Sequence, residues 1–180
     1  MDELWTKRVE QKLSPERITA NLQNAAMYLV AYELLRRSIV DELQAFYLVG
    51  MPGITAPGME REYQEEVSTR HKKVYEASCL WLADQGVFDE SDVAELQRIR
   101  EHRDQIAHEL PALMMDPAFN VDLGLLSRMR HYLGAAGRYW GSVNASLGEI
   151  PADEIDYDGI VSMSMLLFDH IASIVESTEA

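Results

Sequence analysis

The feature that most constrains the fold is an apolar stripe that begins after Ser14 and ends before Gly50. Apolar residues return at steps of three and four for about 30 residues, which is the spacing of one face of an α-helix. Ser14 is a good N-cap, Pro15 suits the first helical position, and Glu16 places an acid in the first turn. A helix of this length is typical of helical bundles. The stripe consists of Ile18, Leu22, Ala25, Leu29, Tyr32, Leu35, Ile39, Leu43 and Phe46.

The rest of the chain divides into four further segments of helical character. Residues 50–58 contain three glycines and two prolines and predict a connecting loop. The second predicted helix spans residues 62–85. The third begins at the caps Asp89 and Ser91 and is terminated by Pro111, and the last two span residues 122–145 and 158–176. No segment alternates apolar and polar residues as a half-buried strand would. We therefore predict an all-α fold, an antiparallel four- to five-helix bundle that forms one domain over residues 1–180.

Three glycines interrupt the helix predicted for residues 122–145. Gly134, Gly137 and Gly141 fall within about 60° of one another on a helical wheel. Each costs about 1 kcal/mol relative to Ala inside a helix. We expect the close approach of another helix, from the same subunit or across a dimer, to compensate.

The charge balance limits the partners that the chain can attract. With 30 acidic and 16 basic residues the formal net charge is −14, which argues against indiscriminate binding to nucleic acids or anionic membranes. Residues 123–148 nevertheless contain no acid, so a local positive surface is compatible with the acidic total. The lone Cys79 indicates a reducing compartment. No segment resembles a signal peptide or a membrane span, and we expect a cytoplasmic protein with neither membrane nor DNA as its partner.

The stretch that indicates chemistry is Arg103-Asp104-Gln105-Ile106-Ala107-His108 on the third predicted helix. Arg103 projects to the centre of an apolar face, where a charge needs an acidic partner or a cavity or interface. Asp104 precedes His108 by four positions, a spacing at which a carboxylate can hold an imidazole nitrogen. A guanidinium can stabilise charge on phosphorus while an imidazole transfers a proton, so the three side chains suggest phosphate chemistry. The apolar face consists of Val93, Leu96, Ile99, Ile106 and Leu110.

This stretch resembles the signature of the HEPN superfamily, small helical bundles with an Arg, a polar residue, a few further positions and a His. The resemblance implies a homodimer in which two motif helices meet, and a metal-independent endoribonuclease that uses no cofactor, in a defence or stress response. Arg103 would stabilise the phosphorane, His108 would transfer a proton during attack by the ribose 2′-hydroxyl, and Asp104 would match the polar position. The product would carry a 2′,3′-cyclic phosphate.

Two features qualify this resemblance. In an ideal helix Arg103 and His108 point about 140° apart, so they need a loosened last turn or donation from two subunits to reach one phosphate. Some toxin members carry a modifiable tyrosine two places after the histidine, where this chain has Leu110. That difference argues against a toxin–antitoxin pairing of that kind.

Basic residues elsewhere offer a path for an RNA backbone. The densest run lies at 70–73, and further arginines precede the motif on the same helix. The other interpretation of these residues is a solvated helix face. The predicted RNA-binding residues are Arg70, Lys72, Lys73, Arg98 and Arg100.

Two alternative functions remain open at this point. One is a catalytically inactive helical protein for dimerisation or partner binding, in which Arg103 belongs to an ion pair. The other is a magnesium-dependent, MazG-like nucleotide pyrophosphohydrolase, because carboxylates lie one helical turn apart on two predicted helices. An open groove at His108 flanked by arginine favours the ribonuclease, whereas a sealed Arg103 paired with a carboxylate favours the inactive protein. Clustering of Glu62, Glu65, Glu101 and Asp104 favours the pyrophosphohydrolase.

Overall fold

A computed structural model describes residues 3–49, 59–146, 159 and 161–179 of the chain. Every secondary-structure element in these ranges is a helix, so the prediction of an all-α fold is confirmed. The predicted loop at 50–58 lies outside the described residues. The elements are α1 (Glu3–Lys12), α2 (Pro15–Arg36), the π-helical turn η1 (Arg37–Asp41), α3 (Glu42–Gln44), the π-helical turn η2 (Ala45–Val49), α4 (Met59–Tyr63), the π-helical turn η3 (Gln64–Ser68), α5 (Val74–Asp84), α6 (Glu90–His108), α7 (Leu110–Met115), α8 (Leu123–Ser146) and α9 (Met163–Glu179).

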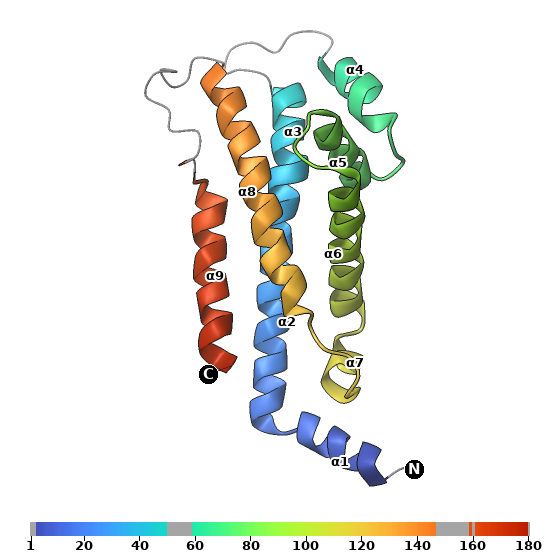
Figure 1. Cartoon of the computed structure of the whole chain (residues 1–180). Coiled ribbons are helices and arrows are strands. Elements are labelled where there is room, and N and C mark those ends of the chain that lie inside the picture. Colours follow the sequence, from blue (N-terminus) through green and yellow to red (C-terminus); the bar gives the residue numbers. More distant parts are fainter. Residues whose placement is uncertain (1–2, 50–58, 147–158, 160, 180) are drawn as a thin grey trace.

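The long segments run up and down alternately (Figure 1). The helix that starts with α2 rises, α6 descends, α8 rises, and α9 descends. α5 runs antiparallel to α6, since Glu76 at its start pairs with Arg100 in the second half of α6. α2 packs against α6, α8 and α9, so it forms the centre of the bundle. At its lower end α1 and α7 contact each other and the start of α2. None of the described helices is long and apolar enough to cross a membrane.

The predicted long helix is present from Pro15 to Val49, but it contains two π-helical turns. The hydroxyl of Ser14 accepts a hydrogen bond from the backbone N–H of Arg17, as expected of an N-cap. A π-helical turn holds more residues than an α-helical turn, which shifts the inward face along the sequence. Tyr47 is therefore 5% exposed, whereas Phe46, which was predicted to be inward, is 40% exposed.

The predicted helix over 62–85 is two helices, because the chain leaves helical geometry between η3 and α5. Tyr63, Val67 and Trp81 are buried, whereas Val74 opens α5 and is exposed. α1 and α7 were not predicted. α6 begins with a capping box between Asp89 and Asp92, and it ends before Pro111, which lies in the first turn of α7.

The glycines of α8 allow the close approach of α9. A Cβ atom placed on Gly134 would lie 2.9 Å from the terminal methyl of Met165, and one on Gly137 would lie 3.6 Å from the hydroxyl of Ser162. The first separation is too short for two carbon atoms, so a side chain on Gly134 would require the flexible end of Met165 to move, whereas the separation at Gly137 is an ordinary van der Waals contact. Of the two explanations for these glycines, the structure supports contact within one chain.

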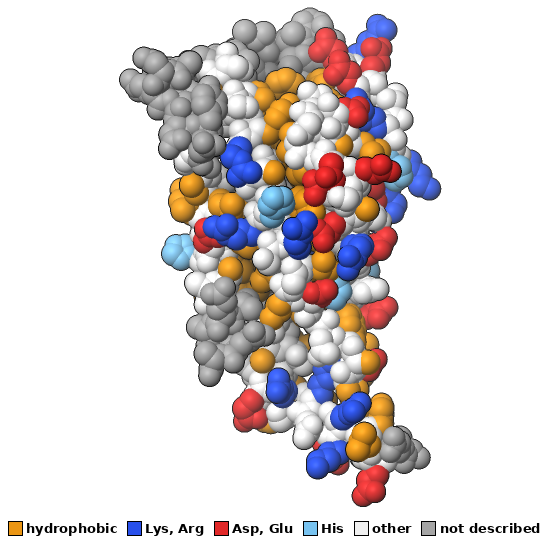
Figure 2. Space-filling model, in the orientation of Figure 1, with side chains coloured by type: hydrophobic (Ala, Val, Ile, Leu, Met, Phe, Trp, Pro, Cys, Tyr) orange, Lys and Arg blue, Asp and Glu red, His pale blue; other side chains and the backbone are white. Residues whose placement is uncertain are grey.

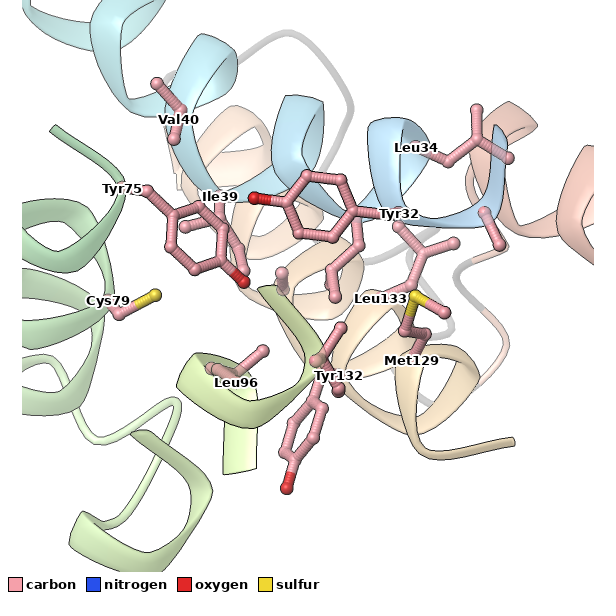
Figure 3. Close-up of a cluster of buried hydrophobic side chains, with 14 of the residues drawn as sticks. Tyr32, Leu34, Ile39, Val40, Tyr75, Cys79, Leu96, Met129, Tyr132 and Leu133 are labelled. Atoms are coloured by element: carbon pink, nitrogen blue, oxygen red, sulfur yellow. The ribbon is translucent and has the colours of Figure 1, made fainter. Parts of the chain in front are cut away.

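The core is a continuous cluster of side chains from α2, α5, α6 and α8 (Figure 3). Tyr28, Ile99 and Tyr132 have no exposed surface. Trp81 and Trp140 stack with ring centroids 6.3 Å apart, and the indole N–H of Trp140 donates to the carbonyl oxygen of Ser38. These tryptophans are core residues and are not available to stack on bases.

Acidic and basic side chains alternate over much of the face that is shown in Figure 2. Arginines of this chain commonly lie beside carboxylates, as in the pairs of Arg128 with Glu95 and Arg130 with Asp169. The positive stretch noted at 123–148 is therefore partly neutralised by acids from other helices.

The thiol of Cys79 provides a test of the packing between α5 and its neighbours. Cys79 is 2% exposed, and burial raises the pKa of its thiol to about 12. Because only the thiolate reacts readily, we expect the native protein to resist iodoacetamide at about pH 8 and the urea-unfolded protein to react once. Mass spectrometry measures both outcomes. As a control, Ser173→Cys on the exposed part of α9 should react in the native state; rapid native alkylation of the wild type would contradict the packing.

Candidate functional site

The candidate site is the second half of α6, which carries Arg103, Asp104 and His108. The helix keeps α-helical geometry through His108, and Glu109 caps it with its N–H donating to the carbonyl oxygen of Gln105. The last turn is therefore not loosened. Within one chain, Arg103 and His108 project to different sides of α6.

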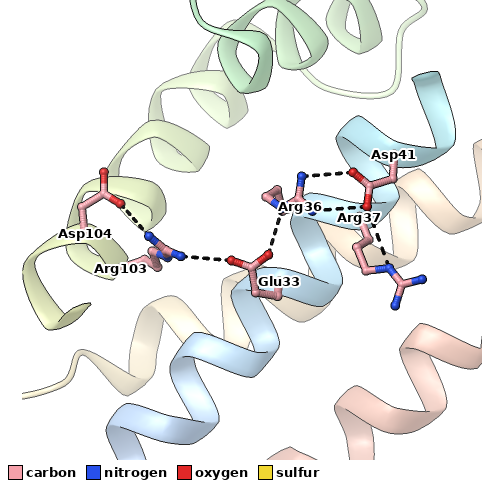
Figure 4. A network of polar contacts seen from close by, with 6 residues as sticks. All are labelled: Glu33, Arg36, Arg37, Asp41, Arg103 and Asp104. Atoms are coloured by element: carbon pink, nitrogen blue, oxygen red, sulfur yellow. Dashed lines mark hydrogen bonds and ion pairs between the residues drawn. The ribbon is translucent and has the colours of Figure 1, made fainter. Parts of the chain in front are cut away.

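Arg103 is held by two carboxylates (Figure 4). Its Nη2 lies 3.1 Å from Oε1 of Glu33 on α2, and its Nη1 lies 3.2 Å from Oδ1 of Asp104. The side chain of Arg103 is 32% exposed, so the guanidinium is ion-paired without being sealed from solvent. The ion pairs of Arg103 are the feature expected of the inactive protein, and its exposure to solvent is the feature expected of the ribonuclease.

Glu33 connects Arg103 to a chain of charges along the central helix (Figure 4). Its other oxygen, Oε2, accepts from Nε of Arg36 at 2.9 Å, and Arg36 in turn donates to both oxygens of Asp41. Arg37 lies 3.9 Å from Asp41 and is the most exposed member. The network fixes the position of Glu33 and so limits the directions in which Arg103 can point.

An aromatic ring lies beneath the guanidinium. Cζ of Arg103 lies 5.4 Å from the ring centroid of Tyr32, a cation–π arrangement. Burial raises the pKa of the Tyr32 hydroxyl well above its usual value, opposed by the nearby charges of Arg103 and Arg100. Tyr32 is therefore neutral at physiological pH and acts here as a packing surface for the arginine.

A buried polar layer between α5 and α6 adjoins this arginine and was not predicted. Arg100 Nη1 pairs with Oε1 of Glu76 at 3.2 Å, and Tyr75 contacts Tyr32, the residue below Arg103. Five buried side-chain atoms have no hydrogen-bond partner among the described residues, which is costly and marks an unusual interior. They are Tyr75 Oη, Glu76 Oε2, Gln97 Oε1, Arg100 Nε and Arg103 Nε.

Asp104 and His108 do not form the pair that their spacing suggested. The carboxylate of Asp104 accepts from Arg103, and within the described part of the chain the imidazole of His108 has no hydrogen-bond partner. His108 is exposed at the end of α6. Asp104 therefore orients the arginine in this structure and leaves the imidazole free to meet another group.

The predicted RNA-binding residues do not form one strip of free cations. Arg70 pairs with Asp84, and Lys73 and Arg100 both pair with Glu76. Lys72 and Arg98 are exposed, and neither forms an ion pair with a described residue.

Among the described residues, no group of three or more His, Cys, Asp or Glu side chains lies close enough together to hold a metal ion. Glu65 pairs with Arg61, and Glu101 accepts from Gln97. Asp104, which the pyrophosphohydrolase alternative also required, pairs with Arg103. The clustering that would favour a MazG-like enzyme is absent from this part of the chain.

Comparisons of the chain with protein-family models, with curated proteins and with solved structures found no match. The HEPN resemblance therefore depends on the six-residue motif and on the all-α architecture that carries it.

The accessibility of Arg103 can be tested through Glu33, whose side chain is 45% exposed. Ion pairs this exposed contribute about 0–1 kcal/mol, so we expect Glu33→Gln to lower the free energy of unfolding by less than about 1 kcal/mol. Urea titrations should show this difference shrinking at high salt.

The matched control is Glu65→Gln, which removes one ion pair with the highly exposed Arg61 and should change stability less. A loss above about 3 kcal/mol for Glu33→Gln would mean that Arg103 behaves as a buried charge. That result would favour the inactive interpretation of the motif.

Proposed function

We propose that the protein is a metal-independent endoribonuclease of the HEPN type that acts as a homodimer. The observation that carries this proposal is the state of the motif on α6. Arg103 is fixed in orientation by Glu33, Asp104 and Tyr32 yet keeps 32% of its side chain exposed, and the imidazole of His108 is exposed and unpaired within the described chain. A preset cation and a free proton-transfer group are what cleavage of an RNA backbone requires.

The chemistry assigns one step to each group. His108 accepts the proton of a ribose 2′-hydroxyl, whose oxygen attacks the adjacent phosphorus. Arg103 donates hydrogen bonds to the non-bridging oxygens as negative charge accumulates on the phosphorane. The bond to the 5′-oxygen breaks, that oxygen takes up a proton, and a 2′,3′-cyclic phosphate remains.

The carboxylates around Arg103 do not prevent this role. A phosphate must compete with Glu33 and Asp104, whose side chains are 45% and 40% exposed. Ion pairs at such exposure are weak because water screens them, whereas a phosphate can form two parallel hydrogen bonds with a guanidinium. Glu33 also keeps a second partner in Arg36 when Arg103 turns to a phosphate.

A homodimer resolves the divergence of the two side chains. Because α6 is regular through His108, one chain cannot bring Arg103 and His108 to the same phosphate without distortion. A two-fold axis beside α6 would place Arg103 of one subunit opposite His108 of the other and create two equivalent sites.

The first test is cleavage of a mixed RNA pool by the purified protein in EDTA. We expect cyclic phosphate at the new 3′ ends and a rate at least about 100-fold lower for His108→Ala, because general acid–base catalysis commonly contributes that much. His170→Ala removes another exposed imidazole, on α9, and should cleave like the wild type. Absence of cleavage, or cleavage that His108→Ala retains, would reject the ribonuclease.

A second test examines whether the site is shared between subunits. Arg103→Ala and His108→Ala should each be inactive alone, but dimers that exchange subunits should combine one intact Arg103 with one intact His108. Random exchange of an equal mixture should restore about a quarter of the wild-type rate, because half of the dimers would be mixed with one complete site each. Circular dichroism verifies that both variants are folded. An exchanging mixture that stays inactive would place the whole site in one subunit.

The inactive dimerisation or partner-binding protein is the second candidate, and the ion pairs of Arg103 with Glu33 and Asp104 favour it. In that protein the motif would join α6 to α2 and have no substrate. Its expected signature is a dimer that leaves RNA intact in the first assay.

A further inference from the structure

A hollow of about 780 Å³ lies at the lower end of the bundle, where α1 meets the start of α2. Its walls are α1, the first turns of α2 and the segment 116–120 that follows α7. A volume between about 300 and 1,000 Å³ is typical of small-molecule and cofactor sites. The hollow is therefore large enough to hold a nucleotide.

A buried lysine joins two of these walls. Lys12 is 8% exposed, and its ammonium donates to the backbone carbonyl oxygens of Asp116 and Phe119 and to Oδ1 of Asn120. These contacts tie the end of α1 to a segment more than 100 residues away in sequence. Because Lys12 uses its donors on these carbonyls, it shapes the hollow and leaves ligand binding to other side chains.

Two arginines bring unneutralised charge to this hollow. The guanidinium groups of Arg8 and Arg17 have no ion pair or hydrogen bond within the described residues, although arginines elsewhere in this acidic chain are commonly paired. The acid of the lining, Asp116, already accepts from the backbone N–H of Ala118. Figure 2 shows several Lys and Arg side chains at this end of the molecule, together with a few acidic ones. The hollow therefore attracts anions.

An aromatic ring and two amides complete the lining. Trp5 is 48% exposed, whereas Trp81 and Trp140 are both less than 10% exposed. No aromatic ring of the described chain packs against Trp5, so its indole is available to a planar ligand. Asn21 also lines the hollow and carries both donors and an acceptor. Asn120 lines it too, but its Oδ1 accepts from Lys12 and its Nδ2 donates to the carbonyl oxygen of Pro117.

We propose that this hollow binds a nucleotide unit of single-stranded RNA. The indole of Trp5 stacks on the base, Arg8 and Arg17 contact flanking phosphates, and the amide of Asn21 contacts the base edge. Aromatic stacking beside a cationic groove is the general mode of single-strand recognition, and it does not depend on sequence. A phosphate site alone would not explain an exposed tryptophan next to the arginines.

The proposal also deepens the proposed ribonuclease, on which its biological role rests. α7 begins two residues after His108 and contacts both α1 and α2, so the hollow lies toward the end of the bundle to which α6 descends. RNA held there would extend the contact surface of the enzyme beyond its motif. Binding itself does not require cleavage and can be measured separately.

The experiment measures fluorescence anisotropy of a labelled octameric RNA, oligo(U) or oligo(A), with full-length His108→Ala protein in EDTA, so that the probe stays intact. We expect Trp5→Ala to weaken binding roughly 5- to 150-fold, the range for loss of one stacked base. Arg8→Ala combined with Arg17→Ala should flatten the slope of log affinity against log salt by about 1.4, because two phosphate contacts are lost.

The matched control is Arg37→Ala combined with Arg61→Ala, which removes the same charge from two exposed arginines outside the hollow. It should leave binding within about twofold of the parent, since it touches none of the proposed contacts. Binding should also quench tryptophan fluorescence, and Trp5→Ala should abolish that quenching. Circular dichroism verifies that each variant is folded.

Two outcomes would overturn the proposal. Equal weakening by the control pair would mean that only overall charge matters, and displacement of RNA by inorganic phosphate at equal concentration would mean a simple anion site. Failure of the ribonuclease gives a different pattern, in which the octamer binds with the expected losses but wild-type protein leaves RNA intact. Cleavage without any effect of Trp5→Ala on binding would reject the hollow and keep the ribonuclease.

Discussion

The structure depends on covering the central helix. Tyr28, Leu35 and Ile39 on this helix have no exposed surface, and the helix packs against α6, α8 and α9 together. A helix that buries more than one face requires neighbours on several sides, which fixes the up-and-down arrangement. α9 contributes to this cover by packing against both α8 and α2, with Met165 lying close over Gly134.

The candidate site lies where this cover becomes incomplete. Ile99 and Ile106 of α6 are fully buried, but Arg103 between them emerges beside Glu33 at the edge of the interface with α2. The position allows the guanidinium to lie over the ring of Tyr32 and still reach water. An arginine fully enclosed by the bundle could not meet a phosphate, and one fully exposed would lack a fixed direction.

Local patterns predicted the elements, and contacts distant in sequence determined the differences. The stripe after Ser14, the caps of α6 and the inward position of Arg103 depend on neighbouring residues, so they could be predicted. The partner of Arg103 could not, because Glu33 is 70 positions away. The break between η3 and α5 contains neither Gly nor Pro, and α1 is held by Lys12 through carbonyls of another segment. Neither leaves a periodic signal in the sequence.

The charge of the protein constrains how RNA could reach either proposed site. A net charge of −14 repels a polyanion at long range, but screening limits that repulsion to about 8 Å at physiological ionic strength. Within that distance local charges decide, and the described chain places unpaired arginines at the hollow and a carboxylate-paired arginine at the motif. These two arrangements are consistent with an order of events in which RNA first binds at the hollow and then displaces the carboxylates from Arg103. In the proposed ribonuclease the carboxylates would act as a filter, since a ligand would have to contact Arg103 well enough to replace Glu33 and Asp104.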